Sequence, residues 1–599
     1  MRGNSNPNKA KNPKASLLKL FKYCKKYLPV IIIALVFSIA STLAALWGPG
    51  KVGDIANLIS DGMFSPEGID LEKITKLGIF LVCLYVFVGV FWYFENFLMV
   101  QFSQKISKNL RTDISKKINR LPLKFLDSTP TGDVLSRVTN DIDLISSSLN
   151  NTVSSFISAV ILLIGSIVMM FVTNWIMAFA AIGSSIIGFG IMAVIMAKSQ
   201  KYFMAQQAEL GKLNGYVEEN YSGLSIVRAY GNKEKAIEEF SEINKKLHKN
   251  AWKSQFLSGL MMPLMTFIGN LGYVVVCVVG AVLVAQGKMG FGVIVSFIIY
   301  VRLFSNTLTD FAQIASYVQS MSAASERVFE FLDEKELEVE SPRKKKLRKV
   351  KGDVEFKKVC FGYDKDKTII HDFSAKVKAG QKVAIVGPTG AGKTTLVNLL
   401  MRFYEIDSGE ILIDGVSTKK LSRETVHSLF SMVLQDTWVF DGTVKENIVY
   451  SKENVSNEEV IAACKAIDFD HFVRTLPKGY ETVLDNQTTI SAGQKQLLTI
   501  ARAMIQNCPM LTLDEATSNV DTRTEIQIQK AMDKLSHGRT SFVIAHRLST
   551  IKNANLILVM KDGNIIESGT HKNLMKKGGF YKELYESQFS RKNSEVIDN

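Results

Sequence analysis

One stretch of the chain combines the residues needed to hold nucleotide phosphates. Residues 387–394 read Gly-Pro-Thr-Gly-Ala-Gly-Lys-Thr, which fits the pattern G-x-x-x-x-G-K-[ST], and they follow the apolar, β-rich run 382–386. In such a loop the glycines let backbone N–H groups close around the phosphates. Lys393 can reach the β/γ oxygens, and the Thr394 hydroxyl can hold Mg²⁺. The stretch predicts a site for ATP or GTP. The alternative is a glycine-rich strand-to-helix turn without nucleotide.

A second stretch could supply carboxylates for phosphoryl transfer. The hydrophobic segment 509–513 is expected to be a strand, and Asp514 and Glu515 follow it directly. In this position Asp514 can hold Mg²⁺, and Glu515 can face the attacking water. The alternative is that the two acids are only the first turn of a helix, where negative charge is favourable.

Two further motifs flank these acids, and the order of the whole set is informative. The motif Thr-Ile-Ser-Ala-Gly-Gln over 489–494 lies upstream, and Ile-Ala-His-Arg over 544–547 lies downstream. With the phosphate loop before them and a long apolar half at the N-terminus, the chain resembles an ATP-binding cassette (ABC) exporter. The resemblance covers nearly the whole chain. It implies that the nucleotide is ATP and that Mg²⁺ is bound with it.

The resemblance implies roles for individual residues. Tyr363 matches the aromatic residue that stacks on adenine, although it could equally be a strand aromatic packed on its neighbour. Gln435 matches the residue that senses Mg²⁺ and the attacking water. Glu515 matches the catalytic carboxylate, His546 the histidine that contacts the γ-phosphate, and Asp521 the loop that crosses the dimer.

The complete set of implied site residues falls into three groups. Lys393, Gln435, Glu515 and His546 form the catalytic group, and Thr394, Gln435 and Asp514 form the Mg²⁺-binding group. The ATP contacts are Tyr363, Gly387, Pro388, Thr389, Gly390, Ala391, Gly392, Lys393, Thr394 and Thr395 in one subunit, and the signature residues Ser491, Ala492, Gly493 and Gln494 in the other.

The signature departs from the family pattern Leu-Ser-Gly-Gly-Gln at Ala492, where the family has glycine. This element offers backbone N–H groups to a phosphate at a helix N-terminus, and glycine permits positive φ and close approach. The added Cβ could impair the site, unless φ there is already negative. Asn519 and Val520 also replace the usual Ala-Leu. This combination resembles one half of a heterodimeric bacterial multidrug exporter, so the expected partner is a second half-transporter with an intact signature. A homodimer is the alternative.

The N-terminal half must be the membrane part, because its apolar segments lack the polar face of a soluble helix. At 599 residues the chain is too long for one core. Segments of about 20 apolar residues can cross a bilayer. Six such spans are expected, at 28–48, 77–100, 153–173, 175–197, 256–285 and 291–318.

Charge predicts the orientation of these spans in the cytoplasmic membrane. Residues 1–27 contain 8 basic and no acidic residues, whereas 49–76 contains 3 basic and 5 acidic ones. Because positive loops stay in the cytoplasm, the N-terminus and, after six spans, the ATPase domain are expected there. The net charge of +15 is spread over the N-terminal arm, the loops and the linker, so lipid headgroups are the expected partners and nucleic acid is not.

The predicted fold is an all-α transmembrane domain followed by an α/β ATPase domain. Two long cytoplasmic loops resemble the family's coupling segments, around 127–137 and 218–234, and breaks at Pro130 and Gly132 favour a short helix lying across the nucleotide domain. The expected boundaries are an N-terminal arm with an amphipathic helix (1–27), the transmembrane domain (28–325) with cytoplasmic loops at 101–150 and 199–254, a linker (326–352), the nucleotide-binding domain (353–588) and a tail (589–599).

The predicted function is ATP-driven export of a hydrophobic or amphiphilic substrate, multidrug or lipid-like, by alternating access. The alternatives are a homodimeric lipid or peptide exporter and an ATP-gated regulatory membrane protein without pumping. Two isolated acids in or near the spans, Glu95 and Asp310, are candidates for contact with cationic substrates, although Glu95 could be solvated at a span end. Apolar residues that could line an adaptable cavity are Trp47, Phe91, Trp92, Phe94, Phe97, Met261, Met262, Met265 and Phe304.

Overall fold

The protein forms two compact units. The computed structural model describes residues 12–66, 68–338, 340, 347, 350–364, 366–434, 437–485, 490–514, 521–544 and 551–589. Contacts divide the chain into a helical unit, residues 1–119 and 131–334, and an α/β unit, residues 120–130 and 335–599. The segment 120–130, which the sequence places inside a cytoplasmic loop, therefore packs with the nucleotide-binding part.

The helical unit contains six helices that are long and apolar enough to cross a membrane, which confirms the predicted number among the described residues. Its elements are α1 (Pro13–Cys24), η1 (Lys25–Tyr27), α2 (Leu28–Phe64), α3 (Leu71–Ile118), α5 (Thr131–Ser136), a π-helical turn η2 (Arg137–Asp141), α6 (Ile142–Thr173), α7 (Trp175–Ser222), α8 (Leu224–Ala229), α9 (Lys233–Gly259), α10 (Met261–Ala285) and α11 (Phe291–Asp333).

The helix boundaries follow local chemistry. The Asp70 side chain accepts a hydrogen bond from the Lys73 N–H at the start of α3, and the Asn174 side chain caps α7 at the tight turn after α6. The span predicted at 256–285 is interrupted at Leu260, where α9 ends and α10 begins. Pro263 lies in the first turn of α10, a position where the missing N–H does not break a helical hydrogen bond.

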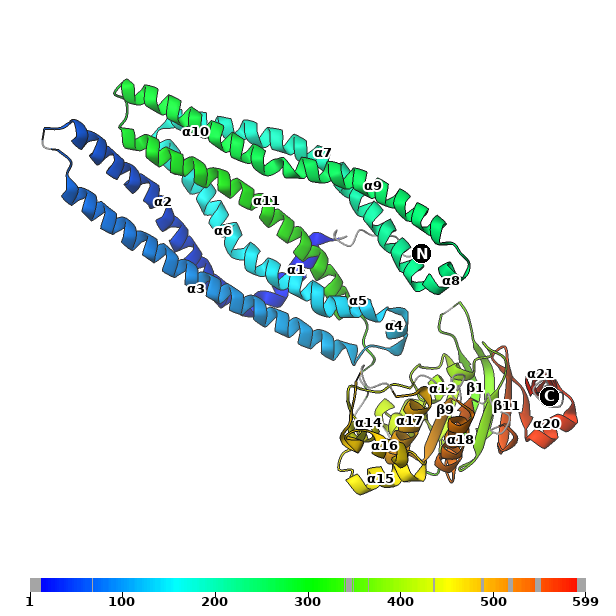
Figure 1. The fold of residues 1–599 in the computed structure, drawn as a ribbon. Coiled ribbons are helices and arrows are strands. Elements are labelled where there is room, and N and C mark those ends of the chain that lie inside the picture. The colour runs from blue at the N-terminus through cyan, green and yellow to red at the C-terminus, as the bar shows by residue number, and fades with distance from the viewer. Residues whose placement is uncertain are drawn as a thin grey trace. The chain divides into compact units, whose positions relative to one another are not determined.

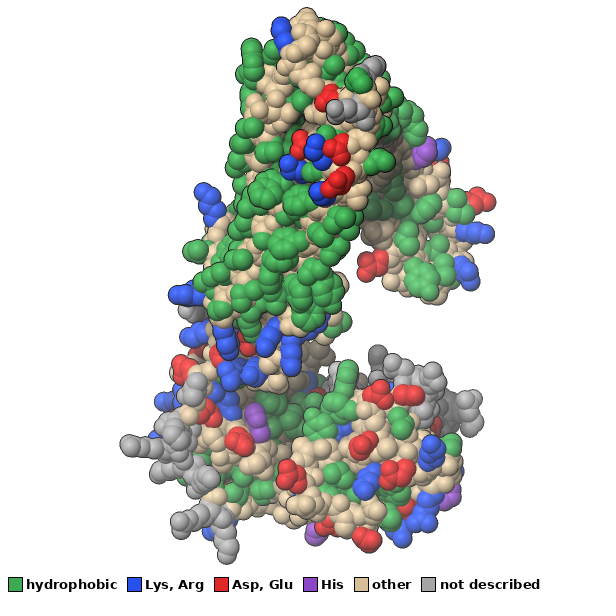
Figure 2. Space-filling model, turned by 90° about the vertical axis from the view of Figure 1, so that its left-hand side faces the viewer, with side chains coloured by type: hydrophobic (Ala, Val, Ile, Leu, Met, Phe, Trp, Pro, Cys, Tyr) green, Lys and Arg blue, Asp and Glu red, His purple; other side chains and the backbone are tan. Residues whose placement is uncertain are grey.

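Helix pairs build the unit. In Figure 1, α2 runs beside α3, and α7 runs beside α9 and α10, while α6 packs against α11. Large apolar side chains cover much of the outer surface, and Figure 2 shows this hydrophobic surface with Lys and Arg gathered toward one end of it. A soluble protein would not expose so many apolar side chains, whereas a lipid bilayer would cover them.

The α/β unit contains two larger sheets. The six-stranded sheet has the order β12-β11-β3-β10-β9-β6, parallel from β11 to β6, and the four-stranded antiparallel sheet has the order β2-β1-β4-β5. The strands are β1 (Val354–Phe361), β2 (Ile370–Val377), β3 (Lys382–Val386), β4 (Ser408–Ile413), β5 (Val416–Ser417), β6 (Phe430–Val433), β7 (Gly442–Thr443), β8 (Val483–Leu484), β9 (Met510–Asp514), β10 (Thr540–Ile544), β11 (Leu556–Lys561) and β12 (Asn564–Gly569).

The α/β unit also contains helices. They are α4 (Leu123–Ser128), α12 (Lys393–Leu400), η3 (Thr418–Lys420), α13 (Arg423–Ser428), α14 (Val444–Val449), α15 (Asn457–Ala466), α16 (Asp470–Thr475), η4 (Gly479–Glu481), α17 (Ala492–Gln506), α18 (Thr522–Ser536), α20 (His571–Lys577) and α21 (Phe580–Phe589).

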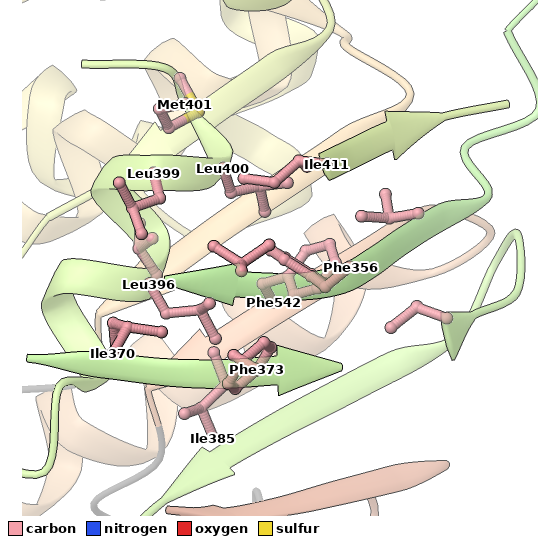
Figure 3. Packing of buried hydrophobic residues seen from close by; sticks show 14 of the residues in the cluster. Phe356, Ile370, Phe373, Ile385, Leu396, Leu399, Leu400, Met401, Ile411 and Phe542 are labelled. Atoms are coloured by element: carbon pink, nitrogen blue, oxygen red, sulfur yellow. The ribbon is translucent and has the colours of Figure 1, made fainter. Parts of the chain in front are cut away.

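The main core fixes α12 between the two sheets. In Figure 3, Leu396 of α12 points toward Ile370 of β2, and Phe356 of β1 lies beside Phe542 of β10. The last two rings are 6.5 Å apart in an edge-to-face arrangement. Each such buried side chain contributes roughly 1.5–3 kcal/mol relative to an exposed one. This packing holds the start of α12, and with it the phosphate loop, at the end of β3.

Candidate active site

The strand register brings the predicted motifs to one edge of the parallel sheet. Ile544 of β10 lies opposite both Ile385 of β3 and Asp514 of β9, and Leu513 lies opposite Val433 of β6. The carboxyl ends of adjacent parallel strands share one edge of a sheet, the usual position of ligands in such folds. The phosphate loop begins at this edge, and Asp514 lies on it.

Glycines shape the loop between β3 and α12. Gly390 and Gly392 have φ of 84° and 94°, in the left-handed region that side chains disfavour. A Cβ at Gly387 would lie 2.3 Å from the backbone oxygen of Met560 in β11. Only glycine can bring the backbone this close to the neighbouring strand.

The Lys393 side chain folds back onto the start of the phosphate loop. Its Nζ donates hydrogen bonds to the backbone oxygens of Gly387, at 2.7 Å, and Pro388, at 3.0 Å, and the residue is only 9% exposed. Burial lowers the pKa of the Lys393 ammonium, and the nearby carboxylate of Asp514 opposes that shift. A cation held at this place is suited to bind phosphate oxygens.

Thr394 and Asp514 provide the oxygen ligands that Mg²⁺ prefers. Thr394 is the second residue of α12, and Asp514 ends β9 close enough to Lys393 to affect the pKa of that ammonium. A hydroxyl and a carboxylate at the edge that holds the phosphate loop fit a magnesium ion shared with the phosphates. The third predicted ligand, Gln435, lies outside the described residues.

Tyr363 packs among aromatic rings beside the loop. Its ring lies edge-to-face with Phe361, at 5.1 Å, and with Tyr404, at 5.0 Å. Its hydroxyl donates to Oγ1 of Thr395 in α12, at 3.2 Å. The tyrosine predicted to stack on adenine is thus hydrogen-bonded to the helix that follows the phosphate loop. It also packs on Phe361 of β1, as expected for a strand aromatic.

The short helix α4 contacts this aromatic group. The hydroxyl of Tyr404 donates to the carboxylate of Asp127, and the ammonium of Lys124 donates to the backbone oxygen of Tyr363. Leu123 packs against the main core. Burial and the Asp127 carboxylate together raise the pKa of Tyr404 above its usual range. Sequence reasoning did not identify Tyr404 or Lys124, because neither belongs to a motif and each contacts residues far away in the chain.

The signature residues begin helix α17. Ser491 is its N-cap, and its Oγ accepts a hydrogen bond from the Gln494 N–H at 3.2 Å, while the Gln494 side chain accepts one from the Ser491 N–H at 2.8 Å. This reciprocal pair is a capping box. Ala492 is the first helical residue and is not among the described residues with positive φ. Its backbone therefore accommodates a Cβ. Gly493 is buried behind it.

Asp521 caps the next helix. Its side chain accepts a hydrogen bond from the Thr524 N–H at 3.0 Å at the start of α18. Hydrogen bonds from backbone N–H groups stabilise the charged form, so they lower the pKa of Asp521. The role predicted for Asp521 across a dimer stays a prediction. The predicted catalytic residues Gln435, Glu515 and His546, and also Asn519 and Val520, lie outside the described residues.

Comparisons with known proteins agree with this architecture. Residues 31–308 match the ABC transporter transmembrane region, and residues 370–518 match the ABC transporter family model. The chain is 43% identical to a fatty acid ABC transporter ATP-binding/permease protein of Mycobacterium bovis, over 88% of this chain and 84% of that protein. It is 32% identical to an ATP-dependent lipid A-core flippase of Syntrophus aciditrophicus, over 95% of this chain and 94% of the flippase.

A solved structure extends the agreement to three dimensions. It is the structure of a bacterial Atm1-family ABC exporter with ATP bound. The two chains superpose with a TM-score of 0.72 and are 27% identical, and the match covers 94% of this chain and 98% of the exporter chain. Together with the six spans and the fused ATPase unit, these matches describe an ATP-hydrolysing, multi-pass protein of the cell membrane whose nucleotide-binding unit is cytoplasmic. The chain belongs to the ABC transporter family, as an exporter half-transporter.

Proposed function

We propose that this half-transporter exports a lipid-like or other amphiphilic substrate across the cytoplasmic membrane by alternating access. The observation that carries the proposal concerns α4, which lies between two helices of the helical unit in the chain. Its Asp127 and Lys124 form hydrogen bonds with Tyr404 and Tyr363 of the aromatic group beside the phosphate loop. The names of two relatives, a fatty acid transporter and a lipid A-core flippase, favour a lipid-like substrate over a broad multidrug range.

In the proposed reaction the loop residues bind and orient the γ-phosphate of ATP. The Lys393 ammonium would compensate the negative charge of the phosphate oxygens, and Glu515 would orient and deprotonate the attacking water. Thr394, Gln435 and Asp514 would hold Mg²⁺, which neutralises phosphate charge when bound. Gln435 and His546 would contact the water and the γ-phosphate, and Tyr363 would stack on adenine.

We propose that the working assembly is a dimer. Helix α8 exposes large apolar side chains among the described residues: Ile226 is 63% exposed, and Tyr230, just after α8, is 85% exposed. Burying such a patch against a second subunit would stabilise the dimer. Closure of two ATPase units around ATP would then bring Ser491, Gly493 and Gln494 of one subunit to the phosphates held by the other.

The heterodimer predicted from Ala492 remains the first proposal for the identity of the partner. A homodimer is the second candidate, and the negative φ of Ala492 favours it, because a Cβ on the first residue of α17 needs no backbone change.

The test is ATP hydrolysis by the chain purified alone in lipid nanodiscs, with Glu515→Gln as the inactive control and Ala492→Gly as the matched repair. Activity in the wild type that Glu515→Gln loses would support a homodimer. Activity only in Ala492→Gly would support the heterodimer proposal. Hydrolysis that Glu515→Gln leaves unchanged would contradict the assignment of the catalytic carboxylate. Hydrolysis without transport of any amphiphile into inside-out vesicles would contradict export.

A further inference from the structure

The helical unit contains a cavity of about 510 Å³. Residues of α2, α3, α6 and α11 line it. A cavity of this size lies in the range typical of small-molecule sites, roughly 300–1,000 Å³. Of the apolar residues whose side chains are described and which the sequence offered as cavity candidates, Trp92 is the one that lines it.

The ionisable side chains that line the cavity are carboxylic acids. Glu95 of α3 and Asp310 of α11 both line it, and none of the lining residues is Lys, Arg or His. Glu95 is only 4% exposed, so it is not a solvated residue at a span end. Neither acid forms an ion pair within the part of the chain that the structure describes. The hydroxyls of Ser38 and Ser154 are the neighbours of the Glu95 carboxyl group.

Other polar atoms in the wall also lack partners. The Asn150 side-chain oxygen is buried and accepts no hydrogen bond in the structure, and Asn150 lines the cavity. A buried acceptor without a donor is destabilising. A ligand that brings N–H donors would remove that cost. Two aromatic residues, Trp92 and Tyr317, also line the cavity, and the faces of such rings attract cations.

We propose that this cavity binds the amine or ammonium head group of an amphiphile. The inference rests on the proposed export function and names the charge class of its substrate. The buried carboxyl group of Glu95, the exposed one of Asp310, an amide oxygen without a donor and aromatic rings favour a cation that donates hydrogen bonds. A carboxylate or phosphate head group would find two acids and no Lys, Arg or His in this wall to compensate its charge.

The test is equilibrium binding to the chain in lipid nanodiscs, with Glu515→Gln in every variant to prevent hydrolysis. The probes are laurylamine, lauryl alcohol and lauric acid, which share one alkyl chain and differ in head-group charge. Empty nanodiscs give the partitioning of each probe into lipid.

We expect saturable binding of laurylamine above the lipid background and none of lauric acid. Glu95→Gln should weaken laurylamine binding roughly tenfold to a hundredfold, the effect of losing a charged hydrogen bond of about 1.5–3 kcal/mol. Asp310→Asn should weaken it less, because Asp310 is exposed. Glu72→Gln is the matched control, because Glu72 lies on the same helix and does not line the cavity.

Several results would overturn the inference. They are equal binding of the alcohol or the acid to wild-type cavities, no binding of any probe above background, or laurylamine binding that Glu95→Gln leaves unchanged. The comparison of probes needs no cavity variant, so misfolding of Glu95→Gln cannot hide the answer. Export is tested separately, since transport of lauric acid without laurylamine would refute the inference and leave the proposed function standing.

Discussion

Two buried ionisable side chains show how differently the two units hold their ligands. Lys393 is 9% exposed and donates to two carbonyl oxygens of its own loop, whereas Glu95 is 4% exposed and has serine hydroxyls as neighbours. In the α/β unit, backbone groups fixed by glycine conformations form the site. In the helical unit, side chains projecting from four helices form it. A backbone site is specific for one chemical group, whereas a side-chain cavity can change its preference with single substitutions.

The largest expected effect comes from Lys393→Met, which keeps an apolar chain of similar length and removes the ammonium. We expect ATP hydrolysis to fall by on the order of a hundredfold to a thousandfold, the loss typical when one group that stabilises transition-state charge is removed. Steady-state hydrolysis in nanodiscs, by the assembly that is active, would measure it. Laurylamine binding should not change, because Lys393 does not line the membrane cavity. If Lys393→Met lost both ATP hydrolysis and laurylamine binding, the two sites would not be independent of each other.

Sequence and structure contributed unequally to these two sites. The loop 387–394 and the helix start at the signature residues could be predicted, because each depends on contacts within a few positions of the chain. Hydropathy likewise predicted six spans, since crossing a bilayer needs a continuous apolar segment.

Other features depend on residues that folding brings together from distant segments. The bond between Tyr404 and Asp127 joins positions 277 apart, and the cavity wall needs Glu95 and Asp310 from different helices. A hydropathy pattern shows that a helix crosses the membrane, but the rotation of each helix about its axis determines which side chains meet. The isolated acids could be recognised in the sequence, whereas the surrounding oxygen atoms and rings could not.

A smaller effect than that of Lys393→Met is expected from Gly387→Ala, which tests whether the backbone forms the phosphate site. Gly387→Ala places a Cβ 2.3 Å from the Met560 backbone oxygen, so the loop or β11 must move. We expect a destabilisation of about 1–3 kcal/mol, as for other overpacked positions, together with weaker ATP binding. Thermal unfolding and nucleotide titration of the full chain would measure both quantities.

Gly89→Ala is the matched substitution in the helical unit. Gly89 lies in α3 beside the cavity residue Val88, and a Cβ there would meet no atom within 4 Å. Alanine in a helix is more favourable than glycine by about 0.5–1 kcal/mol, so Gly89→Ala should leave stability unchanged or raise it. If the two substitutions destabilised the protein equally, the distinction between a backbone site and a side-chain cavity would be wrong.

The smallest expected effect is that of Tyr404→Phe on the coupling of ATP hydrolysis to export through α4. Tyr404→Phe removes the hydroxyl that donates to Asp127 of α4 and keeps the ring that packs on Tyr363. A hydrogen bond to a charged group contributes about 1.5–3 kcal/mol, less where solvent reaches it. We expect α4 to be held less firmly, so that more ATP is hydrolysed per molecule exported, by roughly fivefold. Parallel assays of hydrolysis and vesicle uptake would give this ratio.

Tyr480→Phe is the control for the chemistry of that bond. Tyr480 donates to the Asp470 carboxylate at 2.8 Å, so the same tyrosine–aspartate pair is broken at a position away from α4. This variant should lower thermal stability slightly and leave the ratio of hydrolysis to export as in the wild type. If both variants changed the ratio alike, the effect of Tyr404→Phe would reflect general loosening of the α/β unit. If only Tyr404→Phe changed it, the bond between Tyr404 and Asp127 would be a specific link through which ATP hydrolysis drives export.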